Sequence, residues 1–154
     1  SGLPTILMNC PKICWRHFTV KMMKVLIDTH IFLWLMGGVR IGKSAKTFLN
    51  DTLNNEIFVS DVTAWEIAIK YGIGKLKLPD VPEIWFPDRL HRAGFLSLSI
   101  QIRHALRVYN LPPHHKDPFD RLIISQANAE NLTIVTEDPR FSAYQIKILR
   151  LKNL

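Results

Sequence analysis

The sequence has few cysteines and no long apolar run, and each shortage excludes a class of protein. Of its 154 residues only two are cysteine, and both, Cys10 and Cys14, fall within the first 14 positions. A disulfide framework is therefore excluded, and a structural zinc site is not expected because no second ligand pair accompanies them. No stretch reaches the roughly 18 uninterrupted apolar residues of a membrane span, so a transmembrane protein is excluded as well.

The overall composition of the chain is that of an ordinary globular domain. Hydrophobic residues make up 47% and charged residues 21% of the chain, and about 150 residues bury roughly 68–70% of the unfolded surface, enough for a core without staples. Lys and Arg number 20 against 13 Asp and Glu, a formal charge of +7. A basic balance of this size favours contact with polyanions, but it is equally found in proteins that are merely soluble.

The chain divides into a leading segment and an alternating body. Met22-Met23 before Lys-Val-Leu-Ile-Asp has the form of a natural start on a buried strand. Residues 1–22 are therefore predicted to be an extension outside the domain, a mis-assigned start or a cloning remnant, and residues 23–154 the domain itself. Because the first basic residue, Lys12, follows the apolar stretch and no small-residue cleavage site appears, the extension is a poor secretory signal and a cytoplasmic location is expected.

Apolar runs and helical periodicity alternate along the body. Strands are predicted at 25–28, 56–60, 95–98, 132–136 and 146–149, and helices at 29–36, 44–54, 62–71, 82–93, 101–109 and 118–131. Strands separated by helices of this length favour right-handed crossovers. The prediction is an α/β fold with a mostly parallel sheet covered on both faces.

Acidic side chains stand where this fold would place a ligand. Ligands of open parallel sheets bind beyond the carboxyl ends of the strands. Asp28 ends the first predicted strand, and Asp138 follows the strand predicted at 132–136. Glu66 lies in a helix that is apolar nearly all round and so predicted to be buried, where a carboxylate needs a partner or a metal. Asp120 shares the inward face of its helix with the isoleucines that follow it.

Each acid also has a plain structural role open to it. Asp28 and Asp138 could cap helices or turns, and Asp117, which precedes a proline, is predicted to be a helix cap. Glu66 could pair with the lysine four positions on, and Asp120 could favour the helix dipole. Four converging carboxylates would nevertheless destabilise the fold unless a cation lay among them. A hard ion, Mg²⁺ or Mn²⁺, suits oxygen ligands better than zinc does.

Four motifs occur in order along the chain: Lys24-Val-Leu-Ile-Asp28-Thr-His30, Thr63-Ala-Trp65-Glu66-Ile67, His115-Lys-Asp-Pro-Phe-Asp120-Arg-Leu and Ile134-Val-Thr136-Glu-Asp138. Over about residues 23 to 151 the sequence resembles the PIN-domain ribonucleases, and within them the VapC-type toxins of toxin–antitoxin pairs. The resemblance implies a three-layer α/β/α domain. It also implies that Asp28, Glu66, Asp120 and Asp138 hold a divalent metal, Mg²⁺ or Mn²⁺, with Thr136 at a neighbouring hydroxyl position of the catalytic site.

The function that the resemblance implies is that of a toxin that cleaves RNA, pairs with a VapB-like antitoxin and forms a homodimer. Asp138 is expected to be the carboxylate left free to orient an attacking water. The histidines His30, His114 and His115 are expected to lie in loops or at the surface.

Two other function classes stay open. One is a non-catalytic RNA-binding module, which would not need four converging acids. The other is a Mg²⁺-dependent small-molecule phosphohydrolase, although the D-x-D-x-T motif of one such class is absent because Thr29 and His30 follow Asp28.

Basic side chains outnumber the acids that would remain around such a site. Three of the 20 Lys and Arg precede residue 22, and setting aside the four predicted ligands leaves 17 basic against 9 acidic side chains. A surface of this charge can hold RNA phosphates. The predicted contacts are Arg40, Lys43, Lys46, Lys75, Lys77, Arg103, Arg107, Lys116 and Arg121, and Trp65 is expected in the core.

Overall fold

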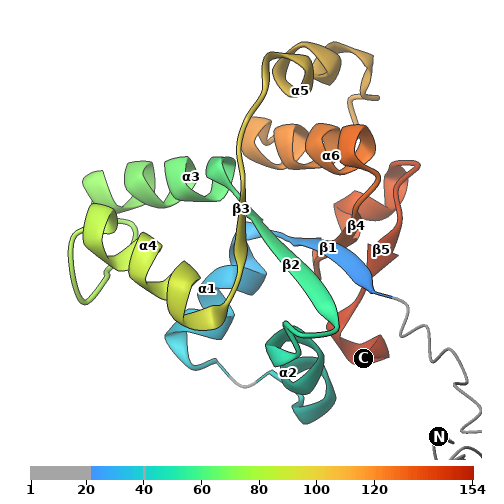
Figure 1. Ribbon diagram of the computed structural model, residues 1–154. Helices are drawn as coiled ribbons and strands as arrows, with labels where there is room; N and C mark the ends of the chain where they lie inside the picture. The colour runs from blue at the N-terminus through green and yellow to red at the C-terminus, as the bar shows by residue number, and fades with distance from the viewer. Residues whose placement is uncertain (1–21, 40) are drawn as a thin grey trace, which may run out of the picture.

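Five strands form one sheet at the centre of the structure, a computed structural model that describes residues 22–39 and 41–154 (Figure 1). They are β1 (Met23–Ile27), β2 (Asn55–Ser60), β3 (Leu96–Leu98), β4 (Thr133–Val135) and β5 (Ile148–Leu149). Every neighbouring pair is parallel, in the order β3-β2-β1-β4-β5. The predicted strands and the parallel sheet are confirmed. The predicted extension lies outside the described residues except for Met22, and Arg40 lies outside them too.

Helices follow the strands as the alternation predicts. They are α1 (Thr29–Gly37), α2 (Lys43–Asn50), α3 (Asp61–Gly72), α4 (Pro82–Ala93), α5 (Ile102–Arg107) and α6 (Pro118–Glu130), with 3₁₀ turns η1 (Val108–Asn110), η2 (Pro139–Ala143) and η3 (Leu151–Asn153). The predicted helix 44–54 is too long, because the chain leaves α2 at Asn50 and Asp51 then accepts hydrogen bonds from the Asn54 amide. Within the described part of the chain, no helix is long and apolar enough to cross a bilayer.

Side chains from the two faces of the sheet fill two separate apolar clusters. One cluster joins β1 and β2 to α1, α2 and α4, and includes Val25, Ile27, Phe32, Leu49 and Trp85. The other joins β1 and β4 to α6 and η2, and includes Leu26, Ile123, Ile124, Ile134 and Phe141. Since successive strand residues point to opposite faces, β1 feeds both clusters. The helices thus form two layers around the sheet (Figure 1), which confirms the three-layer α/β/α architecture.

Helix α3 is half exposed, so the prediction that this helix is buried and that Trp65 lies in the core is wrong. Its buried residues are Val62, Thr63, Glu66 and Ile67. Trp65 lies on the outer flank with 53% of its surface exposed, and its ring packs edge-on against Phe119 with the ring centroids 4.9 Å apart. Trp65 is therefore a surface residue and not part of the core, because the buried face of α3 is the one that carries the carboxylate of Glu66.

Candidate active site

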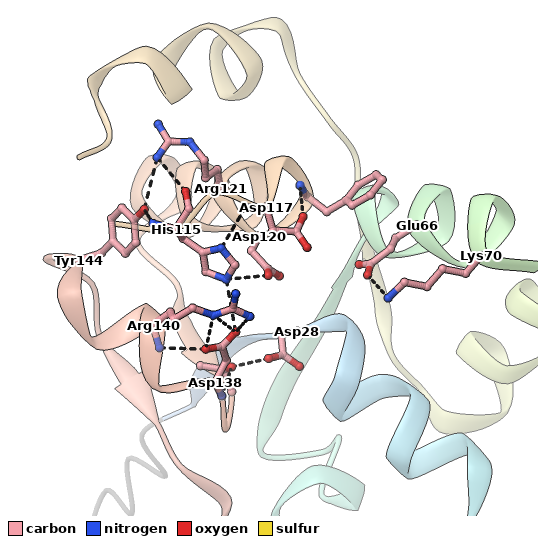
Figure 2. A network of polar contacts seen from close by, with 12 residues as sticks. Asp28, Glu66, Lys70, His115, Asp117, Asp120, Arg121, Asp138, Arg140 and Tyr144 are labelled. Carbon is pink, nitrogen blue, oxygen red and sulfur yellow. Dashed lines mark hydrogen bonds and ion pairs between the residues drawn. The ribbon is translucent and has the colours of Figure 1, made fainter. Parts of the chain in front are cut away.

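Asp28 follows β1 directly. It is the N-cap of α1 and the first residue of the candidate site along the chain (Figure 2). One carboxylate oxygen accepts the backbone N–H of Ile31 at 2.8 Å, which caps the helix, and the other accepts the hydroxyl of Thr136. The side chain is buried, and burial raises the pKa of Asp28 although both hydrogen bonds lower it. The carboxylate therefore caps α1 and also lies against Thr136 at the candidate site, so the cap does not exclude the predicted site role.

Thr136 joins the ends of two neighbouring strands. Parallel pairing sets Ile27 of β1 opposite Val135 of β4, so the residues that follow them, Asp28 and Thr136, lie side by side. The hydroxyl of Thr136 donates to Asp28 and accepts the backbone N–H of Asp138 at 3.1 Å. Three of the predicted site residues are thereby linked through one buried oxygen.

Asp138 is the most fully engaged carboxylate of the group. It caps η2, and the Arg140 guanidinium lies against it with Nε 3.0 Å from one oxygen and a terminal nitrogen 2.7 Å from the other. The hydrogen bond from Arg140 is the main reason that the pKa of Asp138 falls to about 2. The expectation that Asp138 is the free carboxylate is therefore wrong, because its neighbour two positions on supplies a partner.

Asp120 faces the same edge from the first turn of α6. Asp117 caps this helix by accepting the backbone N–H of Phe119 at 2.9 Å, as predicted. Asp120 is buried, and its pKa rises to about 8, first through burial and then through the charges of Asp117, Glu66 and the two acids at the strand ends. The carboxylates are thus close enough to disfavour one another's charge.

Glu66 stands beside this group on the buried face of α3, and Figure 2 shows its carboxylate next to Lys70. One oxygen pairs with the Lys70 ammonium, the i+4 partner that the sequence left open. The other oxygen, Oε2, is buried and has no hydrogen-bond partner among the described residues. A buried carboxylate oxygen without a partner is costly, so this position calls for a donor or a cation.

His115 is buried at the centre of the acids, contrary to the expectation of a loop or surface histidine. Only 1% of its surface is exposed, and its Nε2 lies 2.9 Å from an oxygen of Asp120 and 3.3 Å from an oxygen of Asp138 (Figure 2). His30 and His114 are exposed. One feature of the sequence could have indicated that His115 is buried: it begins the His-Lys-Asp-Pro-Phe-Asp motif, two residues before the helix cap.

Two of the four acids, Asp28 and Asp138, line a cavity of about 430 Å³. Its other lining residues are His30, Trp34, Glu137, Pro139 and Arg140. A larger cavity of about 850 Å³ lies elsewhere, between residues of α5, α6 and the 143–145 segment, and its lining includes Arg107 and His114 but no carboxylate. The chemistry of the lining, and not the size of the cavity, therefore identifies the candidate site.

The donor atoms of this site suit a hard divalent ion. Nε2 of His115 and one oxygen each from Asp120 and Asp138 lie within 4.8 Å of one another. The unpartnered oxygen of Glu66 and the raised pKa of Asp120 both indicate that positive charge is missing from the group. Carboxylate oxygens of this kind fit a divalent cation.

Arg121 contacts the backbone of its own domain, although the sequence predicted an RNA contact. Its guanidinium donates to the carbonyls of Pro112 at 2.8 Å, Leu111 at 3.1 Å and Val108 at 3.2 Å. It therefore fixes the loop that leads to His115. Another predicted contact, Arg103, is paired with Glu130.

We expect Arg121→Ala to lower the free energy of unfolding by about 2–3 kcal/mol, because it leaves several carbonyls without a charged donor. Lys46→Ala, at an exposed position of α2, should stay within about 0.5 kcal/mol. Urea unfolding followed by circular dichroism measures both. An Arg121→Ala variant as stable as Lys46→Ala would contradict the structural role of this arginine.

The fold and the acidic edge together define a parallel α/β domain with a carboxylate site suited to a metal ion. The PIN domain family model matches residues 25–147, and the chain belongs to this family. Ribonuclease VapC16 of Mycobacterium tuberculosis is 42% identical over 53 residues, which are 34% of this chain and 38% of that protein. The match thus spans well under half of that relative.

Solved structures show the same fold. VapBC2 from Rickettsia felis bound to a promoter DNA fragment aligns with a TM-score of 0.65 and 20% identity, over 83% of this chain and 98% of that one. DNA-bound VapBC from Salmonella typhimurium gives a TM-score of 0.62 and 19% identity, over 84% and 99%. The predicted family and fold are confirmed.

Proposed function

We propose that the protein is a metal-dependent endoribonuclease and the toxin of a VapBC-type toxin–antitoxin pair. The observation that carries the proposal is the meeting of Asp28, Asp120 and Asp138 at one edge of the sheet of a PIN domain, with Glu66 beside them. The ribonuclease name of the mycobacterial relative supports the same activity.

The proposed metal is Mg²⁺ or Mn²⁺, held by Asp28, Glu66, Asp120 and Asp138. When bound, such an ion lowers the pKa of a water molecule and offsets the charge that builds on a phosphodiester under in-line attack. Thr136 fixes the orientation of the Asp28 carboxylate by its hydrogen bond. Because water and not the ribose 2′-hydroxyl is the nucleophile, the products carry a 5′-phosphate and a 3′-hydroxyl.

The RNA backbone needs positive charge at the mouth of this acidic cavity. Arg140 lines the cavity and is largely exposed, although its guanidinium rests on Asp138. Lys43, Lys46 and Lys116 are exposed. Such side chains can hold phosphates, with an affinity that falls as salt rises.

Cleavage of RNA with and without EDTA tests the proposal and separates it from its alternatives. Internal cuts that need the metal support the nuclease. RNA binding without any cutting would instead support a non-catalytic module, and phosphate release from small esters without RNA cleavage would support a phosphohydrolase.

The proposed partner is a VapB-like antitoxin. Structures of the same fold include VapBC proteins and a toxin–antitoxin complex from Klebsiella pneumoniae. Large apolar side chains on α3, on the residue after it and on α4 are exposed, which is unfavourable in water. These are Trp65, Ile69, Ile73 and Ile84. A homodimer is proposed as well, on the family resemblance.

Co-expression with the product of the gene immediately upstream should give a complex that purifies as one species and does not cleave RNA. The physical reason is that burying exposed apolar surface stabilises association. Size-exclusion chromatography and a cleavage assay before and after mixing measure the effect. Two proteins that elute separately, with cleavage unaffected by mixing, would contradict the antitoxin proposal.

A further inference from the structure

His115 lies among the proposed metal ligands, but the metal chemistry above gives it no role. Its imidazole packs edge-on against Phe141 at a centroid distance of 5.7 Å, and its backbone N–H donates to the Tyr144 hydroxyl at 2.8 Å. The side chain itself is fully buried. A ring fixed in this way presents one defined nitrogen to the acids.

The backbone of Asp117 determines which ring nitrogen carries the proton. Its N–H donates to Nδ1 of His115 at 3.1 Å, and a nitrogen that accepts a hydrogen bond bears no proton. The proton of the neutral ring therefore resides on Nε2.

The protonated Nε2 faces two carboxylates at once. It lies 2.9 Å from Oδ2 of Asp120 and 3.3 Å from Oδ2 of Asp138. A protonated nitrogen has no lone pair to offer a cation. The cluster of His115, Asp120 and Asp138 thus resembles a mixed nitrogen and oxygen metal site by distance alone, whereas its proton distribution makes the nitrogen a donor.

We propose that His115 is a positioning residue and not itself a metal ligand: its Nε2–H donates to Oδ2 of Asp138 and lies against Oδ2 of Asp120, which fixes the two carboxylates relative to each other. This inference rests on the proposed metal site. It makes the site all-oxygen, which favours Mg²⁺ and Mn²⁺ over zinc.

Two substitutions test the roles of the two ring nitrogens of His115 separately. The amide nitrogen of Gln reaches the place of Nε2 and keeps a donor toward the carboxylates, so His115→Gln should bind Mn²⁺ within about threefold of the unmodified protein. Asn places its oxygen near Nδ1 and keeps the acceptor for Asp117 but reaches neither carboxylate. His115→Asn should bind Mn²⁺ about 10–100-fold more weakly, the usual cost of losing a partner that orients a ligand.

Calorimetry with Mn²⁺ on the full chain measures these affinities, after thermal unfolding has shown that both variants fold. A merely structural role through the Asp117 contact reverses the order, with Asn rescuing and Gln failing. That reversed order, or equal affinities for the two variants, would overturn the inference.

The ¹⁵N signals of the imidazole give a second and independent readout. We expect Nε2 to be protonated and Nδ1 unprotonated in the metal-free protein, and both to stay so when Mg²⁺ or Zn²⁺ is added. Loss of the Nε2 proton on adding either metal would make His115 a ligand and overturn the inference. If the unmodified protein bound no Mn²⁺, the proposed metal site would fail, while a proton on Nδ1 of the metal-free protein would refute the role of His115 separately.

Discussion

RNA incubated with the purified protein and Mg²⁺ should be cut internally, and Asp28→Asn and Asp120→Asn should each slow the cut by at least about 100-fold. Each variant removes a carboxylate from the proposed metal site. Loss of a partner that only orients a ligand costs about 10–100-fold, so loss of the ligand itself should cost more. Initial rates on an end-labelled RNA at one fixed salt concentration measure the effect, and EDTA should abolish the cut.

Asp88→Asn is the matched control for this loss. Asp88 lies on α4 and pairs with Arg92 at the surface, so the same change of charge away from the cavity should leave the rate unaltered. The ends of the products identify the nucleophile, since a metal-dependent hydrolysis leaves a 5′-phosphate and attack by the 2′-hydroxyl leaves a 5′-hydroxyl. Cuts that survive EDTA and both variants, or that leave 5′-hydroxyl ends, would refute the proposed function.

The fold could be predicted because the signals for its strands and helices lie in short stretches of neighbouring residues. The central strand β1 is a short apolar run closed by a polar residue, and α1, α3 and α6 begin at the side-chain caps Asp28, Ser60 and Asp117. Parallel pairing then requires the strand ends to meet at one edge. The convergence of Asp28, Thr136 and Asp138 follows from that rule and needs no knowledge of side-chain contacts.

Apart from the pair of Asp138 with Arg140, the contacts that the sequence did not predict come from partners distant along the chain or from the choice of a helix face. His115 and Arg121 are polar residues that could equally have faced solvent, and only the packing of the loop before α6 buries His115 and gives Arg121 its carbonyl partners. Trp65 has the appearance of a core residue, yet Glu66 takes the buried face of α3. No periodicity distinguishes a helix that buries its carboxylate from one that buries its tryptophan.

Burying the acids close together lowers the stability of the metal-free protein. The pKa of Asp120 is about 8 against an ordinary value of 3.8, so between these values the unfolded chain releases a proton that the folded chain retains. The metal-free protein should therefore lose stability as pH rises from about 4 to about 8. Asp28, with its raised pKa, acts in the same direction, whereas the lowered pKa of Asp138 matters only below about pH 4.

Asp120→Asn should accordingly be more stable than the unmodified protein when both are metal-free, by about 2 kcal/mol or more at pH 8 and by less at pH 5, since each unit of pKa shift corresponds to about 1.4 kcal/mol. Urea unfolding in EDTA at the two pH values measures the difference, and Asp88→Asn should show none. Added Mn²⁺ should stabilise the unmodified protein and Asp88→Asn by mass action but Asp120→Asn far less. An Asp120→Asn variant less stable than the unmodified protein at pH 8 in EDTA would mean that this carboxylate supports the fold, and that the acids at the sheet edge do not repel one another.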